Sequence, residues 1–113
     1  MYEYQASLMS IHDGDTVWMH VDLGCRITLD MELRLYGVDA PELRTNAGDL
    51  ALSWITQWFK DNPAPYTVRT VKDKKEKWGR YLATVICPKT AATLNTDLIS
   101  SGNAKAYFGG TRA

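Results

Sequence analysis

The sequence lacks two features that would narrow its function at once: an excess of charge and a long apolar run. Of 113 residues, 13 are Lys or Arg and 13 are Asp or Glu, so the formal net charge is zero. Such a chain has no global attraction to nucleic acid, and any phosphate binding must come from local clusters. No stretch approaches the roughly 20 apolar residues of a membrane span, so we expect no membrane association.

Cysteine is also scarce, since only Cys25 and Cys87 are present. Two isolated cysteines make no zinc pattern of the CxxC type. We favour two unpaired, buried or half-buried side chains and leave a disulfide open. The N-terminus lacks the basic start and apolar run of a signal peptide, so we expect a cytoplasmic protein. Removal of a leader from a secreted protein would leave the same sequence.

The length and composition fit one folded domain. A chain of 113 residues predicts a single domain over residues 1–113, with one modest core. Hydrophobic residues make up 45% and charged residues 23%, which is ordinary for a soluble globular protein and unlike a disordered one.

Alternating hydrophobicity predicts three strands in the first part of the chain. Residues 4–12 form one candidate, and residues 16–23 and 26–35 alternate with a period of two. Asp22-Leu23-Gly24 supplies turn chemistry, so the second and third strands form a hairpin. One face of the third strand is apolar and comprises Ile27, Leu29, Met31, Leu33 and Leu35.

Helical spacing and further strands follow. Residues 47–60 predict a helix, and Asn62-Pro63 ends it. Its apolar side chains are Ala51, Trp54, Ile55, Trp58 and Phe59. Strands are predicted at residues 66–71 and 81–87, a charged turn or loop at 73–77, and a second helix at 93–101. This order favours a β-rich α+β fold, a five-stranded OB-fold β-barrel with two helices, with other small barrels left open.

Two short acidic clusters lie in predicted loops. Residues 12–16 read HDGDT and residues 37–42 read GVDAPE. Carboxylates on loops beside a barrel suit hard cations such as Ca²⁺ or Mg²⁺. Each cluster alone is more typical of a plain turn than of a metal site. We interpret Asp13 as a turn or supporting residue. Arg34 and Arg80 offer planar donors that match phosphate, although a lone arginine is more often a surface salt-bridge residue.

Taken together, these motifs resemble the staphylococcal nuclease (thermonuclease) family, in a compact bacterial or phage-type form. Residues 34–42 (RLYGVDAPE) and 77–83 (KWGRYLA) carry most of the resemblance. Leu94-Asn95 and residues 104–107 are similar to the family's closing helix and the segment after it. The resemblance covers roughly residues 4–109. The loop after Glu42 is shorter than in the family's prototype.

The resemblance implies a metal site and a water-activating residue. Asp15 and Asp39 would bind one Ca²⁺ through their carboxylates, with Mg²⁺ or another divalent ion as the alternative. Ala40 would add its backbone carbonyl. Glu42 would orient or deprotonate the attacking water.

The resemblance also implies the groups that hold the substrate. Arg34 and Arg80 would grip the phosphate and stabilise the charge of the transition state. Lys77 and Trp78 match positions that contact a terminal phosphate, and Tyr107 matches a tyrosine that lines the nucleotide pocket. Lysines between residues 72 and 77 fit either a phosphate-attracting loop or a solvated turn.

These implications favour a calcium-dependent nuclease that acts on DNA and/or RNA with little sequence specificity. No obligate protein partner is expected. The residue types fit phosphodiester hydrolysis, which needs a base, donors for negative charge and a metal as Lewis acid. The alternative is a catalytically silent OB-type nucleic-acid-binding or protein-interaction module, and a purely structural barrel is a third reading. A silent module would have dropped part of the set Asp15, Arg34, Asp39, Glu42 and Arg80, and none is dropped.

Overall fold

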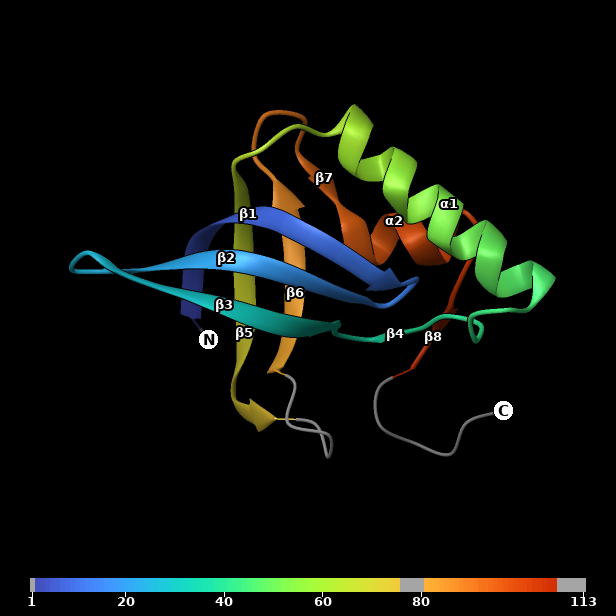
Figure 1. The fold of residues 1–113 in the computed structure, drawn as a ribbon, viewed down its shortest axis with the longest axis horizontal. Helices are drawn as coiled ribbons and strands as arrows, with labels where there is room; N and C mark the ends of the chain where they lie inside the picture. The colour runs from blue at the N-terminus through green and yellow to red at the C-terminus, as the bar shows by residue number, and fades with distance from the viewer. Residues whose placement is uncertain (1, 76–80, 108–113) are drawn as a thin grey trace.

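Five long strands close into a barrel. In the computed structural model, which describes residues 2–75 and 81–107, β1 (Tyr2–Asp13), β2 (Thr16–Gly24) and β3 (Ile27–Leu35) form an antiparallel meander. β5 (Tyr66–Lys75) pairs with β1, and β6 (Tyr81–Cys87) pairs with β5. Parallel pairing of β3 with β6 closes the ring (Figure 1). The predicted five-stranded OB-fold barrel is confirmed.

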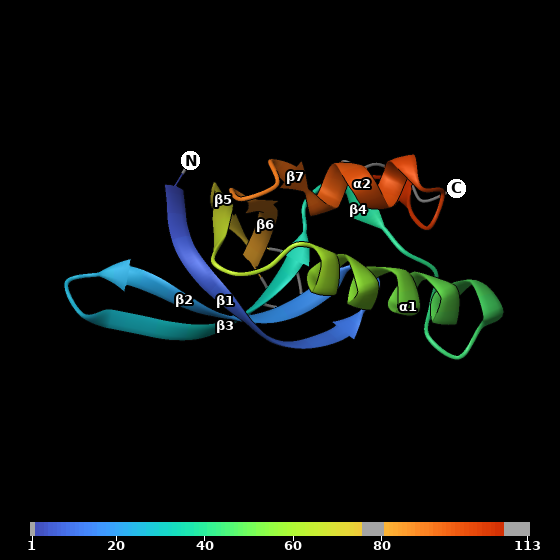
Figure 2. The same ribbon diagram turned by 90° about the horizontal axis from the view of Figure 1, so that it is seen from above.

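Two helices and three very short strands complete the fold. α1 (Asn46–Asp61) lies between β4 (Val38–Asp39) and β5, and α2 (Leu94–Ser100) follows β7 (Ala92–Thr93). β8 (Lys105–Ala106) pairs with β4. Seen from above, both helices lie at the end of the molecule opposite the β2–β3 hairpin tip (Figure 2). Within the described ranges, no helix has the length and apolarity to span a membrane.

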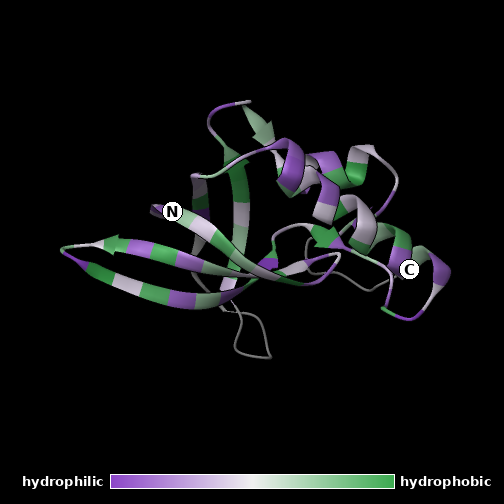
Figure 3. Cartoon of the chain, turned by 45° about the horizontal axis from the view of Figure 1, so that its top comes forward, coloured by the Kyte–Doolittle hydropathy of each residue, from purple (hydrophilic) through white to green (hydrophobic). Residues whose placement is uncertain are grey.

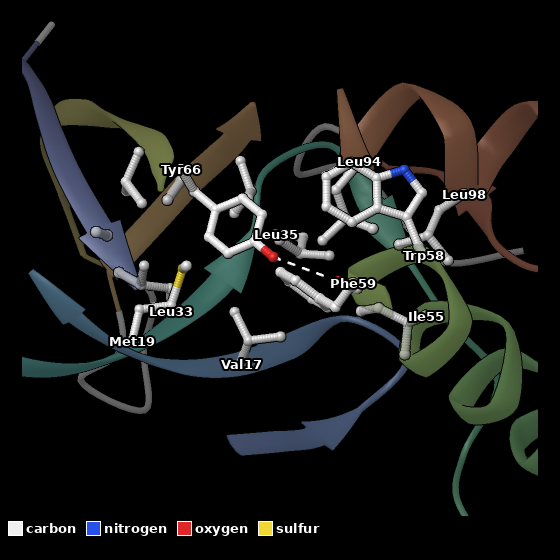
Figure 4. Close-up of a cluster of buried hydrophobic side chains, with 14 of the residues drawn as sticks. Val17, Met19, Leu33, Leu35, Ile55, Trp58, Phe59, Tyr66, Leu94 and Leu98 are labelled. Carbon is white, nitrogen blue, oxygen red and sulfur yellow. Dashed lines mark hydrogen bonds between the residues drawn. The ribbon is translucent and has the colours of Figure 1, made fainter. Parts of the chain in front are cut away.

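The core lies between the barrel and the helices. Its fully buried side chains include Met19, Leu33 and Leu35 from the strands and Ile55 from α1 (Figure 4). The helical spacing predicted for residues 47–60 is confirmed, with Ala51, Ile55, Trp58 and Phe59 buried and Trp54 packed at the margin. Trp58 Nε1 donates to Asp97 Oδ2 at 2.9 Å, which joins the two helices.

The β2–β3 hairpin extends beyond the barrel. Leu33 and Leu35 are fully buried, but Ile27 and Leu29 on the same alternating face are 56% and 49% exposed. Their side chains are exposed because the hairpin outruns the structure that could cover it (Figure 1), although its hydropathy alternates along its length (Figure 3). A period-two pattern therefore predicted the strand correctly but overstated its burial.

The hairpin turn lies later than predicted. Positive φ angles fall at Gly24 (85°), Cys25 (52°) and Arg26 (64°), so the turn begins at the last residue of the predicted Asp22–Gly24 segment and continues two residues beyond it. Asp22 Oδ1 accepts from Gly24 N at 2.8 Å, so Asp22 leads into the turn without forming its tip. Cys25 is exposed at this tip and Cys87 is buried in β6, and both are free thiols. The expected burial of Cys25 was wrong because the turn faces solvent.

β5 is longer than the sequence predicted. It continues to Lys75, so the turn or loop predicted at residues 73–77 is wrong for its first three positions. Pairing with β6 resumes at Lys75 opposite Tyr81 after a register shift beyond Thr70. Backbone pairing sustains the strand there without an apolar pattern. Residues 76–80 lie outside the described part of the chain.

Candidate active site

The turn between β1 and β2 carries the first acidic cluster. Asp13 Oδ1 accepts from the backbone N of Asp15 at 3.0 Å, which is an Asx turn and confirms Asp13 as a turn residue. A Cβ on Gly14 would lie 2.8 Å from Ala40 Cβ and 2.9 Å from Ala51 Cβ. The turn therefore packs directly against α1 and against the segment that follows β4.

Asp15 lies in this turn, immediately before β2, and is buried, only 9% exposed. Its Oδ2 accepts from the backbone N of Ala40 and its Oδ1 from the Thr16 hydroxyl, each at 3.0 Å. Burial and, after it, the neighbouring Asp13 raise the pKa of Asp15 to about 6, although the charge of Arg34 offsets part of the rise. The backbone of Ala40, the residue after Asp39, thus holds the Asp15 carboxyl in place.

Arg34 lies near the end of β3 and joins two of the predicted ligands. Its Nη1 is 3.3 Å from Asp15 Oδ2, and its Nη2 is 3.6 Å from Asp39 Oδ1. Nη1 also donates to the carbonyl of Val38 at 2.6 Å. Arg34 is only 7% exposed, whereas the Asp39 side chain is 24% exposed, so the group opens to solvent on that side. We call these three residues the Asp15–Arg34–Asp39 cluster.

The segment that carries Asp39 is fixed by the C-terminal part of the chain. In the β4–β8 pair, Asp39 lies opposite Lys105. Beyond β8, the backbone N of Tyr107 donates to the carbonyl of Gly37 at 2.9 Å. The structure therefore brings Tyr107, predicted to line a nucleotide pocket, beside the connection from Arg34 to Asp39.

The Glu42 side chain makes no hydrogen bond or ion pair with the Asp15–Arg34–Asp39 cluster among the described residues. It is exposed three residues after Asp39, and its carbonyl accepts from the Thr45 hydroxyl at 2.7 Å. Within the described residues its carboxylate has no hydrogen bond or ion pair, so Glu42 forms no salt bridge with Arg34. The predicted residues Arg80, Lys77 and Trp78 lie outside the described part of the chain.

Asn95 is a supporting residue for which the sequence predicted no role beyond its motif. Buried at the start of α2, it donates through Nδ2 to the carbonyls of Tyr36 and Ala83 at 2.9 and 3.0 Å. Its Oδ1 accepts from the backbone N of Val85 at 3.1 Å. Asn95 thus ties β6 to the residue two positions after Arg34. An asparagine within an apolar helix stripe was the signal that could have identified it.

The donor groups of the cluster suit a hard cation with open coordination positions. Among residues 2–75 and 81–107, no group of three or more His, Cys, Asp or Glu side chains could hold a metal ion. Asp15 and Asp39 nonetheless present two carboxylates beside one guanidinium. Oxygen donors of this kind fit Ca²⁺ or Mg²⁺, with water and substrate supplying the remaining ligands.

A closed OB-type barrel with paired carboxylates on a buried arginine defines a nuclease-like fold. A family model described as "Staphylococcal nuclease homologue" matches residues 32–112, more than half of the chain. The protein therefore belongs to the staphylococcal nuclease homologue family. Comparison with curated proteins gave no match. The matched segment contains Arg34, Asp39, Glu42 and Arg80, and the fold adds Asp15 from the turn between β1 and β2.

Proposed function

We propose that this protein is a calcium-dependent nuclease that hydrolyses phosphodiester bonds of DNA and/or RNA with little sequence specificity. The observation that supports it best is the Asp15–Arg34–Asp39 cluster, in which one buried guanidinium lies 3.3 and 3.6 Å from two carboxylates. Asp15 and Asp39 come from separate parts of the chain, yet their carboxylates gather at one buried arginine, an arrangement of oxygen donors that suits a hard cation.

The ion would be held by Asp15, Asp39 and the backbone carbonyl of Ala40. Ca²⁺ fits these hard oxygen donors, and Mg²⁺ or another divalent ion is the alternative. When bound, the ion supplies a Lewis acid and a template for the phosphate. The residues of the chain itself do the rest of the chemistry.

Hydrolysis adds the oxygen of water to phosphorus and breaks the bond from phosphorus to the leaving sugar oxygen. Glu42 would take up the proton that the water releases. Its carboxylate is exposed and has no ion pair among residues 2–75 and 81–107, which suits it to this role. The leaving oxygen would take a proton from solvent. A carboxylate engaged in a salt bridge would be a weaker base, so the separation of Glu42 from Arg34 supports this role.

Arg34 and Arg80 would hold the non-bridging phosphate oxygens. A guanidinium carries five N–H groups. Within the described residues, the contacts of Arg34 use Nη1 and Nη2 and leave Nε available for an anion. Lys77 and Trp78 would contact a terminal phosphate, and Tyr107 would line the nucleotide pocket. Because phosphate contacts carry no sequence information, little specificity is expected.

The test is cleavage of single-stranded DNA and RNA by the full chain with Ca²⁺, with Mg²⁺ and with EDTA. We expect cleavage with the metal and none with EDTA. Glu42→Gln and Arg80→Ala should each lower kcat by about 10²-fold or more. Asp49→Asn, which removes an exposed carboxylate from the first turn of α1, is the matched control and should keep full activity.

Two results would contradict the proposal. Cleavage that persists in EDTA, or that survives both Glu42→Gln and Arg80→Ala, would exclude this mechanism. Nucleic-acid binding without any cleavage would identify the silent OB-type module instead.

A further inference from the structure

The loop that carries Glu42 is bonded directly to the start of α1. The Thr45 hydroxyl donates to the Glu42 carbonyl at 2.7 Å. The hydroxyl oxygen of Thr45 also accepts from the backbone N of Gly48 at 2.9 Å. Thr45 is the N-cap of α1, so one side chain both caps the helix and holds the loop. Between them, Arg44 adopts a φ of 68°, which is uncommon for a non-glycine residue.

Gly48 brings the helix onto the backbone of Glu42. A Cβ at this position would lie 1.8 Å from the Glu42 carbonyl oxygen and 2.6 Å from its carbonyl carbon. Both atoms are backbone and cannot rotate away, so no side chain fits there. The first turn of α1 therefore packs on Glu42 with no room for displacement in that direction.

The Glu42 carboxylate depends on this backbone anchor. It has no hydrogen bond or ion pair within the described residues, and it is exposed to solvent. Its mean position is therefore set by where its backbone is held. A base that removes a proton from water must lie within hydrogen-bond reach of it, and a displacement of about 1 Å can cost about 10²-fold in rate.

We propose that Thr45 and Gly48 are positioning residues that fix Glu42 for proton transfer. This inference rests on the proposed function, in which Glu42 is the base. The connection from Glu42 to α1 is only residues 43–45, so a single hydroxyl bridges the whole loop. Without it, the loop keeps its length but loses the contact that holds the Glu42 carbonyl.

The test compares steady-state cleavage of single-stranded DNA by Thr45→Val and Thr45→Ser. Valine matches threonine in shape but has no hydroxyl, whereas serine keeps it. We expect Thr45→Val to lower kcat by about ten-fold or more with KM within about two-fold, and Thr45→Ser to stay near wild type. Thr45→Gly, which an N-cap also tolerates, provides a second hydroxyl-free variant if Thr45→Val does not fold.

A matched control separates positioning from a weakened helix. Ser53→Gly lies at an exposed position in the middle of α1 and destabilises the helix without touching Glu42. It should lower Tm comparably but leave kcat unchanged. In the Glu42→Gln background, Thr45→Val should produce no further fall in kcat, because the residue it positions is already disabled.

The outcomes distinguish this inference from the proposed function. If Glu42→Gln loses activity but Thr45→Val and Thr45→Gly keep the wild-type kcat, the positioning role is wrong and the nuclease stands. An equal fall for Ser53→Gly, or a full further fall in the Glu42→Gln background, also overturns it. If the wild-type chain cleaves nothing with any metal, both proposals fail together.

Discussion

Asp15 is buried between an arginine and a second carboxylate, and this environment makes its ionisation part of the protein's stability. Burial and Asp13 raise the pKa of Asp15 from 3.8 to about 6. Asp13 responds in the opposite direction: burial raises its pKa, but hydrogen bonds with Asp15 and the charges of His12 and Arg34 together lower it. Between pH 3.8 and about 6, the turn thus retains one proton, and it lies on Asp15.

The raised pKa predicts how stability depends on pH without metal. Between pH 3.8 and about 6 the folded chain keeps the Asp15 proton that the unfolded chain has lost. The contribution of Asp15 is therefore complete below pH 3.8 and is lost as the pH rises through about 6. In EDTA, wild type should lose on the order of 2 kcal/mol relative to Asp15→Asn between about pH 4 and pH 7.

Urea denaturation of the two proteins at several pH values in this range measures that difference. Subtracting the Asp15→Asn curve removes the titration of carboxylates that both proteins share. A difference in free energy of unfolding that does not change with pH would show that the Asp15 pKa is not raised.

At the scale of elements, α2 holds together the strands beneath the cluster. Asn95 bonds to the carbonyls of Tyr36 and Ala83 and to the amide of Val85. Tyr36 N also donates to the Ala83 carbonyl at 2.8 Å, so the end of β3 and β6 meet at one point. The buried polar side chain therefore supports the strand that presents Arg34.

Replacing Asn95 should cost much stability. Asn95→Ala removes three hydrogen bonds and leaves the Val85 amide without its partner in a buried site. We expect the free energy of unfolding to fall by about 3 kcal/mol, as for other broken buried networks. Thermal or urea unfolding measures it, with the exposed neighbour Thr96→Ala as the control, which should stay within about 0.5 kcal/mol. Equal effects of the two substitutions would contradict the supporting role of Asn95.

At the scale of the whole molecule, barrel closure assembles a site from separate parts of the chain. Asp15 lies in the turn immediately before β2, Arg34 is near the end of β3, and Asp39 is in β4. Pairing of Thr16 with Arg34 in the β2–β3 ladder places the first two side by side. Tyr107 then returns to Gly37 from the far end of the chain. The fold thus concentrates charge locally in a protein whose net charge is zero.

The sequence predicted those elements that are long enough to show a hydrophobic period. Period-two alternation located the long strands, and helical spacing located α1 with nearly correct ends. The family resemblance predicted that Asp15, Arg34 and Asp39 share one site. In the structure both carboxylates lie within 3.6 Å of the Arg34 guanidinium. The roles of these residues in catalysis stay predictions until activity is measured.

Other features could not be predicted because they depend on tertiary contacts. β4, β7 and β8 have two residues each, which is too short for any periodicity. The exposure of Ile27 follows from the hairpin outrunning the barrel, and alternation does not reveal where a barrel ends. The close approach of Gly48 to Glu42 is likewise visible only once α1 is packed.

The central claim is that the Asp15–Arg34–Asp39 cluster holds the ion that phosphodiester cleavage requires. The most direct test measures the cleavage rate of single-stranded DNA against free Ca²⁺ for wild type and Asp39→Asn, with Asp49→Asn as the matched control. Asp39→Asn keeps the side-chain shape and removes one of two ligand charges. We predict that wild type is inactive in EDTA and recovers on adding Ca²⁺, and that Asp39→Asn needs at least about ten-fold more Ca²⁺ for its half-maximal rate. Cleavage at the same rate in EDTA, or an unchanged Ca²⁺ requirement in Asp39→Asn, would contradict the account.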